Sequence, residues 1–162
     1  MGLTVYSLTD YTLSVVVNDD LLTALGLDSS NNAITIGGNS SYVGQINVEA
    51  RNQSMFSTEG DATGSWVHNK NKSRVGKISV QINQISEKVD LLTRILEYYY
   101  DAASDIGGLT LRVNKLSGNT PIVVAQGNDC YIENNPAKTY GNTAADQTWS
   151  FTCGEVILGT QN

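Results

Sequence analysis

Short apolar runs, separated by Gly, Asn, Asp and Pro, dominate this chain and constrain its fold more than any other feature. The runs are rich in β-branched and aromatic residues, which pack well on a pleated surface. Trp149 and Phe151 are two residues apart, so they face one side of a strand and are expected in the core. The pattern predicts strands at 11–17, 33–36, 46–49, 75–82, 109–113, 121–125, 129–134, 148–153 and 156–158.

Turn residues between these runs suggest how the strands connect. The Gly-rich segment from Gly37 to Gly44 favours a hairpin between the runs at 33–36 and 46–49. Gln126-Gly127-Asn128 likewise predicts a reversal between the strands on either side of it. Near the N-terminus, DDLLTALGL predicts a single helical turn or a loop that stops at Gly26.

One segment departs from the strand pattern and has helical spacing. Val89, Leu92, Ile95, Leu96 and Tyr99 recur on one face, and the Ser before this segment can cap its start. We expect a helix over 86–100. The fold class is therefore mainly β, an antiparallel barrel or sandwich with one flanking α-helix, and the length predicts a single domain over 1–162.

The longest polar segment lies between the strands, from Asn52 to Gly76. Loops of this length usually have a function. Two apolar islands, Met55-Phe56 and Trp66-Val67-His68, flank an EGDATG turn, which predicts an extended hairpin that projects from the body. A projecting hairpin exposes apolar groups and strand edges that favour a partner. The residues predicted to contact another subunit are Met55, Phe56, Thr58, Glu59, Asp61, Trp66, His68, Lys70 and Lys72.

The composition indicates which partners to expect. Only 16% of residues are charged, and a surface poor in charge suits a protein whose faces are covered by neighbours. The formal charge of -6 argues against specific nucleic-acid binding, which needs clustered Lys and Arg. The sequence has neither a signal-peptide pattern at its start nor an apolar stretch long enough to predict a membrane span, so we expect folding in the cytoplasm.

The sequence offers little for catalysis. His68 is the sole histidine, and Cys130 and Cys153 form no C-x-x-C pair, so they are expected as buried thiols. Glu59 and Asp61 lack the alternating acidic series of a calcium loop, and no glycine motif for phosphate is present. We expect no catalytic residues, no metal, no cofactor and no enzyme activity.

Four segments between Val48 and Gly159 follow one another in a recognisable order. They are the hairpin sequence FSTEGDATG, the strand GKISVQI, the helix with its Leu-Leu pair, and Tyr140-Gly followed by QTWSF. In this order they resemble the tail tube proteins of contractile-tailed phages. Members of that family often have Pro after the Ser before the helix, whereas Glu87 follows Ser86 here.

The resemblance implies a barrel whose copies close into hexameric rings, and rings that stack into a hollow tube through which DNA leaves the capsid. The hairpin would then reach an adjacent subunit or ring. The implied partners are further copies of the chain and the tail sheath, baseplate and tape-measure proteins, with DNA passing unbound and no membrane. The implied location is the virion tail, assembled in the host cytoplasm.

Other functions stay open at this point. They are an enzyme, a different virion or injection-machine part such as a baseplate, decoration or contractile-injection tube protein, and a carbohydrate-binding module that uses Trp66 and tyrosines.

Overall fold

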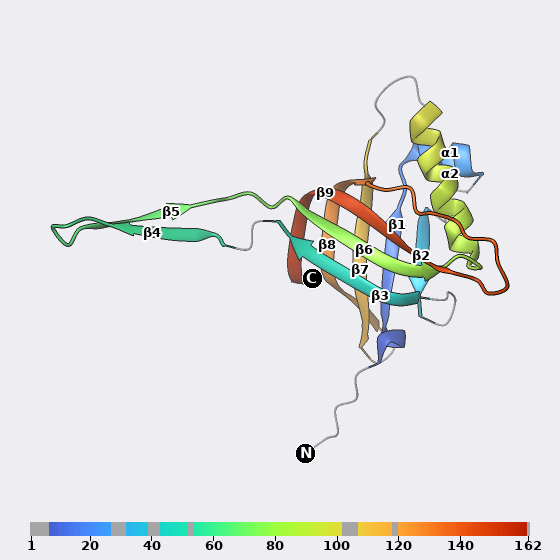
Figure 1. The fold of residues 1–162 in the computed structure, drawn as a ribbon, viewed down its shortest axis with the longest axis horizontal. Coiled ribbons are helices and arrows are strands. Elements are labelled where there is room, and N and C mark those ends of the chain that lie inside the picture. Colours follow the sequence, from blue (N-terminus) through green and yellow to red (C-terminus); the bar gives the residue numbers. More distant parts are fainter. Residues whose placement is uncertain are drawn as a thin grey trace, which may run out of the picture.

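The protein forms a curled antiparallel sheet with two helices on one side and a long hairpin on the other (Figure 1). The computed structural model describes residues 7–26, 32–38, 43–51, 54–101, 107–117 and 120–161. The first two residues of the predicted hairpin, Asn52 and Gln53, lie outside the described residues.

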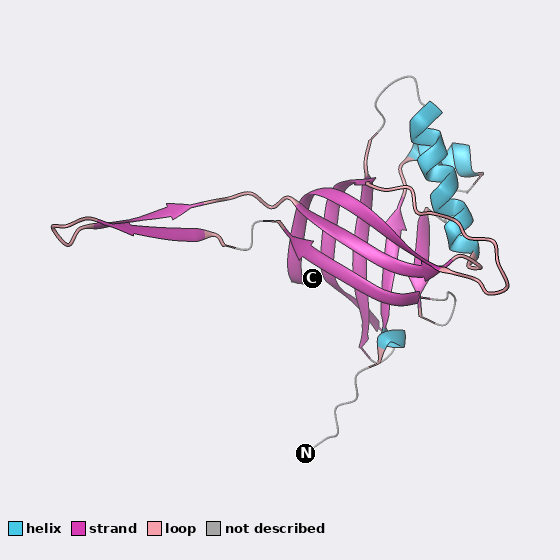
Figure 2. Ribbon diagram, in the orientation of Figure 1, coloured by secondary structure: helices cyan, strands magenta, loops and turns pink. Residues whose placement is uncertain are grey.

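Seven strands make up the main sheet, in the order β2-β1-β7-β8-β9-β6-β3. All neighbouring pairs are antiparallel, and the sheet curls into an open half-barrel (Figure 2). This confirms the predicted fold class. The strands are β1 Tyr11–Val16, β2 Ala33–Gly37, β3 Val43–Ala50, β6 Gly76–Asn83, β7 Leu109–Ser117, β8 Thr120–Ile132 and β9 Asp146–Gln161.

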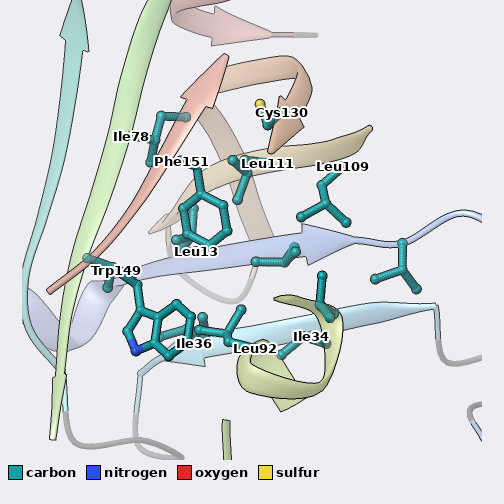
Figure 3. Close-up of a cluster of buried hydrophobic side chains, with 14 of the residues drawn as sticks. Leu13, Ile34, Ile36, Ile78, Leu92, Leu109, Leu111, Cys130, Trp149 and Phe151 are labelled. Atoms are coloured by element: carbon teal, nitrogen blue, oxygen red, sulfur yellow. The ribbon is translucent and has the colours of Figure 1, made fainter. Parts of the chain in front are cut away.

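The core lies on the concave side of the sheet (Figure 3). Period-two alternation places every second side chain inward, as in β6, where Ile78, Val80 and Ile82 are buried. Trp149 and Phe151 of β9 are 1% and 0% exposed, which confirms their predicted core position.

The helices close one side of this core. Helix α2, Glu87–Asp101, directs its buried Leu92 and Ile95 toward the sheet, and the Ser86 hydroxyl accepts a hydrogen bond from the Lys88 N–H (3.3 Å). Helix α1, Asp19–Leu25, is longer than the expected single turn or loop. The Asn18 side chain caps its start, and its buried leucines join the core. The cap and this packing stabilise a helix that would be too short to form alone. A short 3₁₀ turn, Leu8–Asp10, precedes β1.

The predicted reversal at Gln126-Gly127-Asn128 is wrong, because β8 continues through it as one strand. A Cβ on Gly127 would lie 2.8 Å from Cys153 Sγ and 2.9 Å from Cys130 Sγ, so this glycine permits close packing rather than a turn. The positive φ of Asp129, 54°, marks a local irregularity in the strand. The two runs predicted at 148–153 and 156–158 are likewise one strand, β9.

The predicted hairpin between the runs at 33–36 and 46–49 is also wrong. Strand β2 pairs with β1 and strand β3 pairs with β6, so the two form opposite edges of the sheet. Gly38 and Val43 are only five positions apart in sequence, so the two edges of the sheet must lie near each other, as its curl allows. The two runs are therefore neighbours in sequence because they form the two edges of the half-barrel, and not because they pair.

Candidate assembly surface

A second, two-stranded sheet projects from the half-barrel as a hairpin of β4, Phe56–Gly60, and β5, Trp66–Lys70 (Figure 1). Backbone bonds hold its base to the barrel: the Arg51 N–H donates to the Val75 carbonyl at 2.9 Å, and the Val156 N–H donates to the Arg74 carbonyl at 2.7 Å. The hairpin therefore continues directly from β3 and β6, and its base is anchored on β9.

The hairpin has no buried side chain. Every residue from Ser54 to Arg74 is exposed, including four large apolar ones: Met55 at 51%, Phe56 at 55%, Trp66 at 71% and Val67 at 51%. An isolated two-stranded hairpin is marginally stable in water, and clustered exposed apolar groups mark interaction sites. These strands lack an apolar partner within the described part of the chain.

The register sorts the predicted contact residues onto two faces. Phe56 pairs with Lys70, Thr58 with His68, and Gly60 with Trp66, so these side chains share one face. Two contacts support this: Thr58 Oγ1 lies 2.7 Å from His68 Nδ1, and Lys70 Nζ lies 5.7 Å from the centre of the Phe56 ring. We call this the aromatic face, defined by Phe56, Thr58, Trp66, His68 and Lys70.

Asp61 organises the tip of the hairpin. Its Oδ1 accepts hydrogen bonds from the Thr63 hydroxyl (2.7 Å), the Thr63 N–H (2.9 Å) and the Ser65 N–H (3.0 Å). These bonds, led by that of the Thr63 hydroxyl, lower the pKa of Asp61. Gly64 completes the turn with a φ of 89°. The predicted turn is therefore present, and hydrogen bonds to the Asp61 carboxylate join its residues.

The remaining predicted contact residues lie elsewhere on the hairpin. Glu59 is on the face opposite the aromatic face, where it pairs with Val67. Met55 and Lys72 lie at the base and line a cavity of about 400 Å³ together with Arg74 and Glu155. Val67 is an exposed apolar residue that the predicted contact set left out, although the apolar run Trp66-Val67-His68 contains it.

The described residues contain no group of three or more His, Cys, Asp or Glu side chains that could hold a metal ion. Among the helices of those residues, none is long and apolar enough to cross a membrane.

Cys130 and Cys153 are buried free thiols, as expected, and face each other across β8 and β9 with sulfurs 2.7 Å apart. The hydrogen bond with Cys153, together with burial, raises the pKa of Cys130, so this thiol is poorly suited to act as a nucleophile.

Comparisons with known proteins give a likeness in structure alone. Neither a protein-family model nor a curated protein matches the sequence. Among solved structures, a chain of the PVC sheath/tube terminator of an extracellular contractile injection system, in the extended state, matches with a TM-score of 0.58 at 12% identity. That match covers 100% of this chain and 98% of the other.

Two further structures have the same fold. A chain of the anti-feeding prophage cap, the AFP tube terminating cap, matches with a TM-score of 0.56 at 12% identity, over 99% of this chain and 96% of that one. A chain of the PVC sheath-tube complex in the extended state matches with a TM-score of 0.53 at 10% identity, over 92% and 88%. The fold is thus shared with components of contractile injection systems over nearly the whole chain.

Proposed function

We propose that the chain is a structural subunit of the inner tube of a contractile tail, and that its copies close into hexameric rings that stack into a hollow tube. On this proposal residues 1–162 form one tube-type domain with the hairpin as its arm. The resemblance to phage tail tube proteins and the shared fold with injection-system components both support it.

The hairpin is the observation that carries the proposal. It places Phe56 and Trp66 in solvent, 55% and 71% exposed, on an extended arm that packs against no apolar surface of the described chain. A soluble monomer gains nothing from such an arm, whereas a subunit that inserts it into a neighbour buries both rings. Contacts of this head-to-tail kind close into rings or continue as filaments, and a tube needs both.

The charge of the chain is compatible with a conduit for DNA. A formal charge of -6 disfavours retention of phosphates on the tube wall, so DNA would pass without specific binding. The proposal places the subunit in the virion tail, assembled in the host cytoplasm. It pairs the tube with a sheath, which the likeness to a chain of a sheath-tube complex supports, and with baseplate and tape-measure proteins at the ends and in the lumen.

A second candidate is a terminator, a ring that ends the tube. The two structures with the higher TM-scores, 0.58 and 0.56, are described as a sheath/tube terminator and a tube terminating cap, which favours this alternative. Electron microscopy separates the two roles. We expect extended tubes of stacked rings if the purified chain is a tube subunit, and single rings that do not stack if it is a terminator.

The test of the proposal is deletion of Ser57 to Asn71, with a short Gly-Asn linker in their place. We expect a folded protein, because none of the deleted residues is buried, and we expect neither rings nor tubes in negative-stain images. Thermal unfolding followed by Trp149 fluorescence checks the fold. Normal tubes from this variant would refute the role of the arm, and a wild-type protein that stays monomeric at high concentration would refute the proposal as a whole.

A further inference from the structure

A groove lined by tyrosines lies between the C-terminal half of α2 and the end of β8. It encloses about 370 Å³, and we call it the tyrosine groove, defined by Leu96, Tyr99, Tyr100, Tyr131 and Ile132. Its volume is above the lower bound of roughly 300 Å³ for pockets that bury a small ligand. The groove is separate from the hairpin, which lines none of it.

The groove is preorganised, and its aromatic and aliphatic wall is completed by the polar residues Glu133, Asn134 and Asn135. The rings of Tyr99 and Tyr131 meet edge to face, with centres 5.5 Å apart, and the Tyr99 hydroxyl donates to the Gly107 carbonyl at 3.0 Å. Burial and the nearby Tyr131 raise the pKa of Tyr99 to about 12, so this ring stays neutral. Tyr100 is 69% exposed at the rim. A neutral aromatic wall with an exposed ring at its edge suits an aromatic guest.

The distribution of charge along the sequence favours the hairpin of a second copy as the segment that binds in the groove. Between Asn52 and Gly76 the chain has three basic residues, Lys70, Lys72 and Arg74, and two acidic ones, Glu59 and Asp61. This segment is therefore +1 and the rest of the chain -7, within the total of -6. Glu133 lines the groove, but its carboxylate pairs with Lys77 Nζ at 3.2 Å. The acidic charge on this side therefore comes from α2, which ends with Asp101 and has no basic residue in its last turn.

The aromatic face of the hairpin has the complementary chemistry. It presents Trp66 and Phe56 with Lys70 over the Phe56 ring, so it can place aromatic rings against tyrosines and a cation near the acidic end of α2. The hairpin leaves the sheet on the side opposite α2 (Figure 1), so a hairpin cannot reach the groove of its own chain.

We infer that the tyrosine groove receives the aromatic face of the hairpin from a second copy of this chain. The inference rests on the proposed function and adds the receiving surface to it. Arm and groove are different patches on one subunit, so the contact is heterologous. An open row of subunits therefore ends in one free arm and one free groove, and these two join when the row closes into a ring. That asymmetry is what a ring or filament requires.

The first experiment compares two exposed tyrosines. Tyr100→Ala removes a ring from the groove rim, and Tyr140→Ala, at a residue 87% exposed outside the groove, is the matched control. Because tyrosine is enriched among interface hot spots, we expect Tyr100→Ala to weaken self-association at least tenfold in sedimentation velocity and Tyr140→Ala to leave it unchanged. Equal self-association of the two variants would overturn the inference.

The second experiment mixes two variants that each lack one half of the contact. Trp66→Ala keeps its groove and Tyr100→Ala keeps its arm, so we expect each to self-associate at least tenfold more weakly than the wild type when alone. In the mixture, the intact arm of Tyr100→Ala can bind the intact groove of Trp66→Ala. We expect heterodimers that form with the wild-type affinity and do not assemble into larger species. If hairpins instead pair with hairpins, Tyr100→Ala assembles alone as the wild type does, which contradicts the inference.

The outcomes separate this inference from the proposed function. If the Ser57–Asn71 deletion abolishes rings while Tyr100→Ala does not, the arm is required but its receiving surface lies elsewhere, and the inference fails alone. If the deletion leaves normal tubes, the role of the arm in the proposed function fails, and the groove loses its proposed guest with it.

Discussion

The half-barrel and the hairpin contain the same large aromatic residues in opposite environments. The chain has two tryptophans and two phenylalanines, one of each in each region. Trp149 and Phe151 are 1% and 0% exposed in the barrel, whereas Trp66 and Phe56 are 71% and 55% exposed in the hairpin. Residues that stabilise the fold in one region are therefore available to a partner in the other, and the four side chains give matched pairs for testing this.

The largest expected effect is in the barrel. Phe151→Ala leaves a cavity among side chains that are themselves buried, including Ile78 and Leu111, so we expect a loss of about 3–5 kcal/mol in the free energy of unfolding. Urea unfolding followed by far-UV circular dichroism measures it. A loss below about 1 kcal/mol would show that Phe151 does not anchor the core.

The next effect concerns the close packing of Gly127 in β8 against Cys130 and Cys153. A Cβ at Gly127 would lie 2.8 Å from Cys153 Sγ and 3.0 Å from Ile78 Cδ1, both parts of buried side chains. We expect Gly127→Ala to lower the free energy of unfolding by about 1–3 kcal/mol through overpacking. Gly141→Ala is the control, because a Cβ there meets nothing within 4 Å. Equal unfolding midpoints for the two variants would contradict the assignment of Gly127 as a packing residue.

Gly127 also shows where sequence reasoning stops. Period-two alternation and helical spacing are local signals, so the strands, helix α2 and the core positions of Trp149 and Phe151 could be predicted. A glycine between apolar runs has no local signal that separates a turn from a close approach. The side chains that exclude a Cβ there, Cys130 and Cys153, depend on the pairing of β8 with β9.

Surface sites divide in the same way. The hairpin could be predicted because a long polar segment with two apolar islands is a local pattern. The tyrosine groove could not, because it joins Tyr99 and Tyr100 of α2 to Tyr131 of β8, which approach each other only in the folded sheet. The consecutive tyrosines indicated rings at the edge of the core, but not the strand that completes the groove.

A smaller effect should appear at alkaline pH. Burial raises the pKa of Tyr99 to about 12 in the folded protein, against an ordinary value of 10.0. As pH rises above 10, the unfolded chain ionises this tyrosine and the folded protein does not, so its contribution to stability is lost between pH 10 and 12. Since Tyr99 is only half-buried, we expect a loss of about 1 kcal/mol after solvent screening.

The comparison with Tyr99→Phe isolates this contribution from the other titrating groups. Phenylalanine lacks the hydroxyl that donates to Gly107, so the variant starts less stable at pH 7 but loses less stability between pH 10 and 12. Unfolding midpoints in urea at pH 8, 10 and 11.5 provide the measurement. If the stability of the two proteins fell in parallel with pH, the pKa of Tyr99 would be the same in the folded and unfolded protein, which contradicts this prediction.

The smallest expected effect on stability is in the hairpin, and it completes the comparison with Phe151. Phe56 contacts Lys70 on its own hairpin and packs on no buried side chain, so Phe56→Ala should change the free energy of unfolding by less than about 0.5 kcal/mol. The same substitution removes a ring from the aromatic face and should reduce ring formation in negative-stain images. One chemical change then destabilises the fold at residue 151 and impairs assembly at residue 56. If Phe56→Ala instead lowered stability by more than about 1 kcal/mol, the hairpin would be part of the folded core in solution, and its exposed rings would no longer argue for a partner.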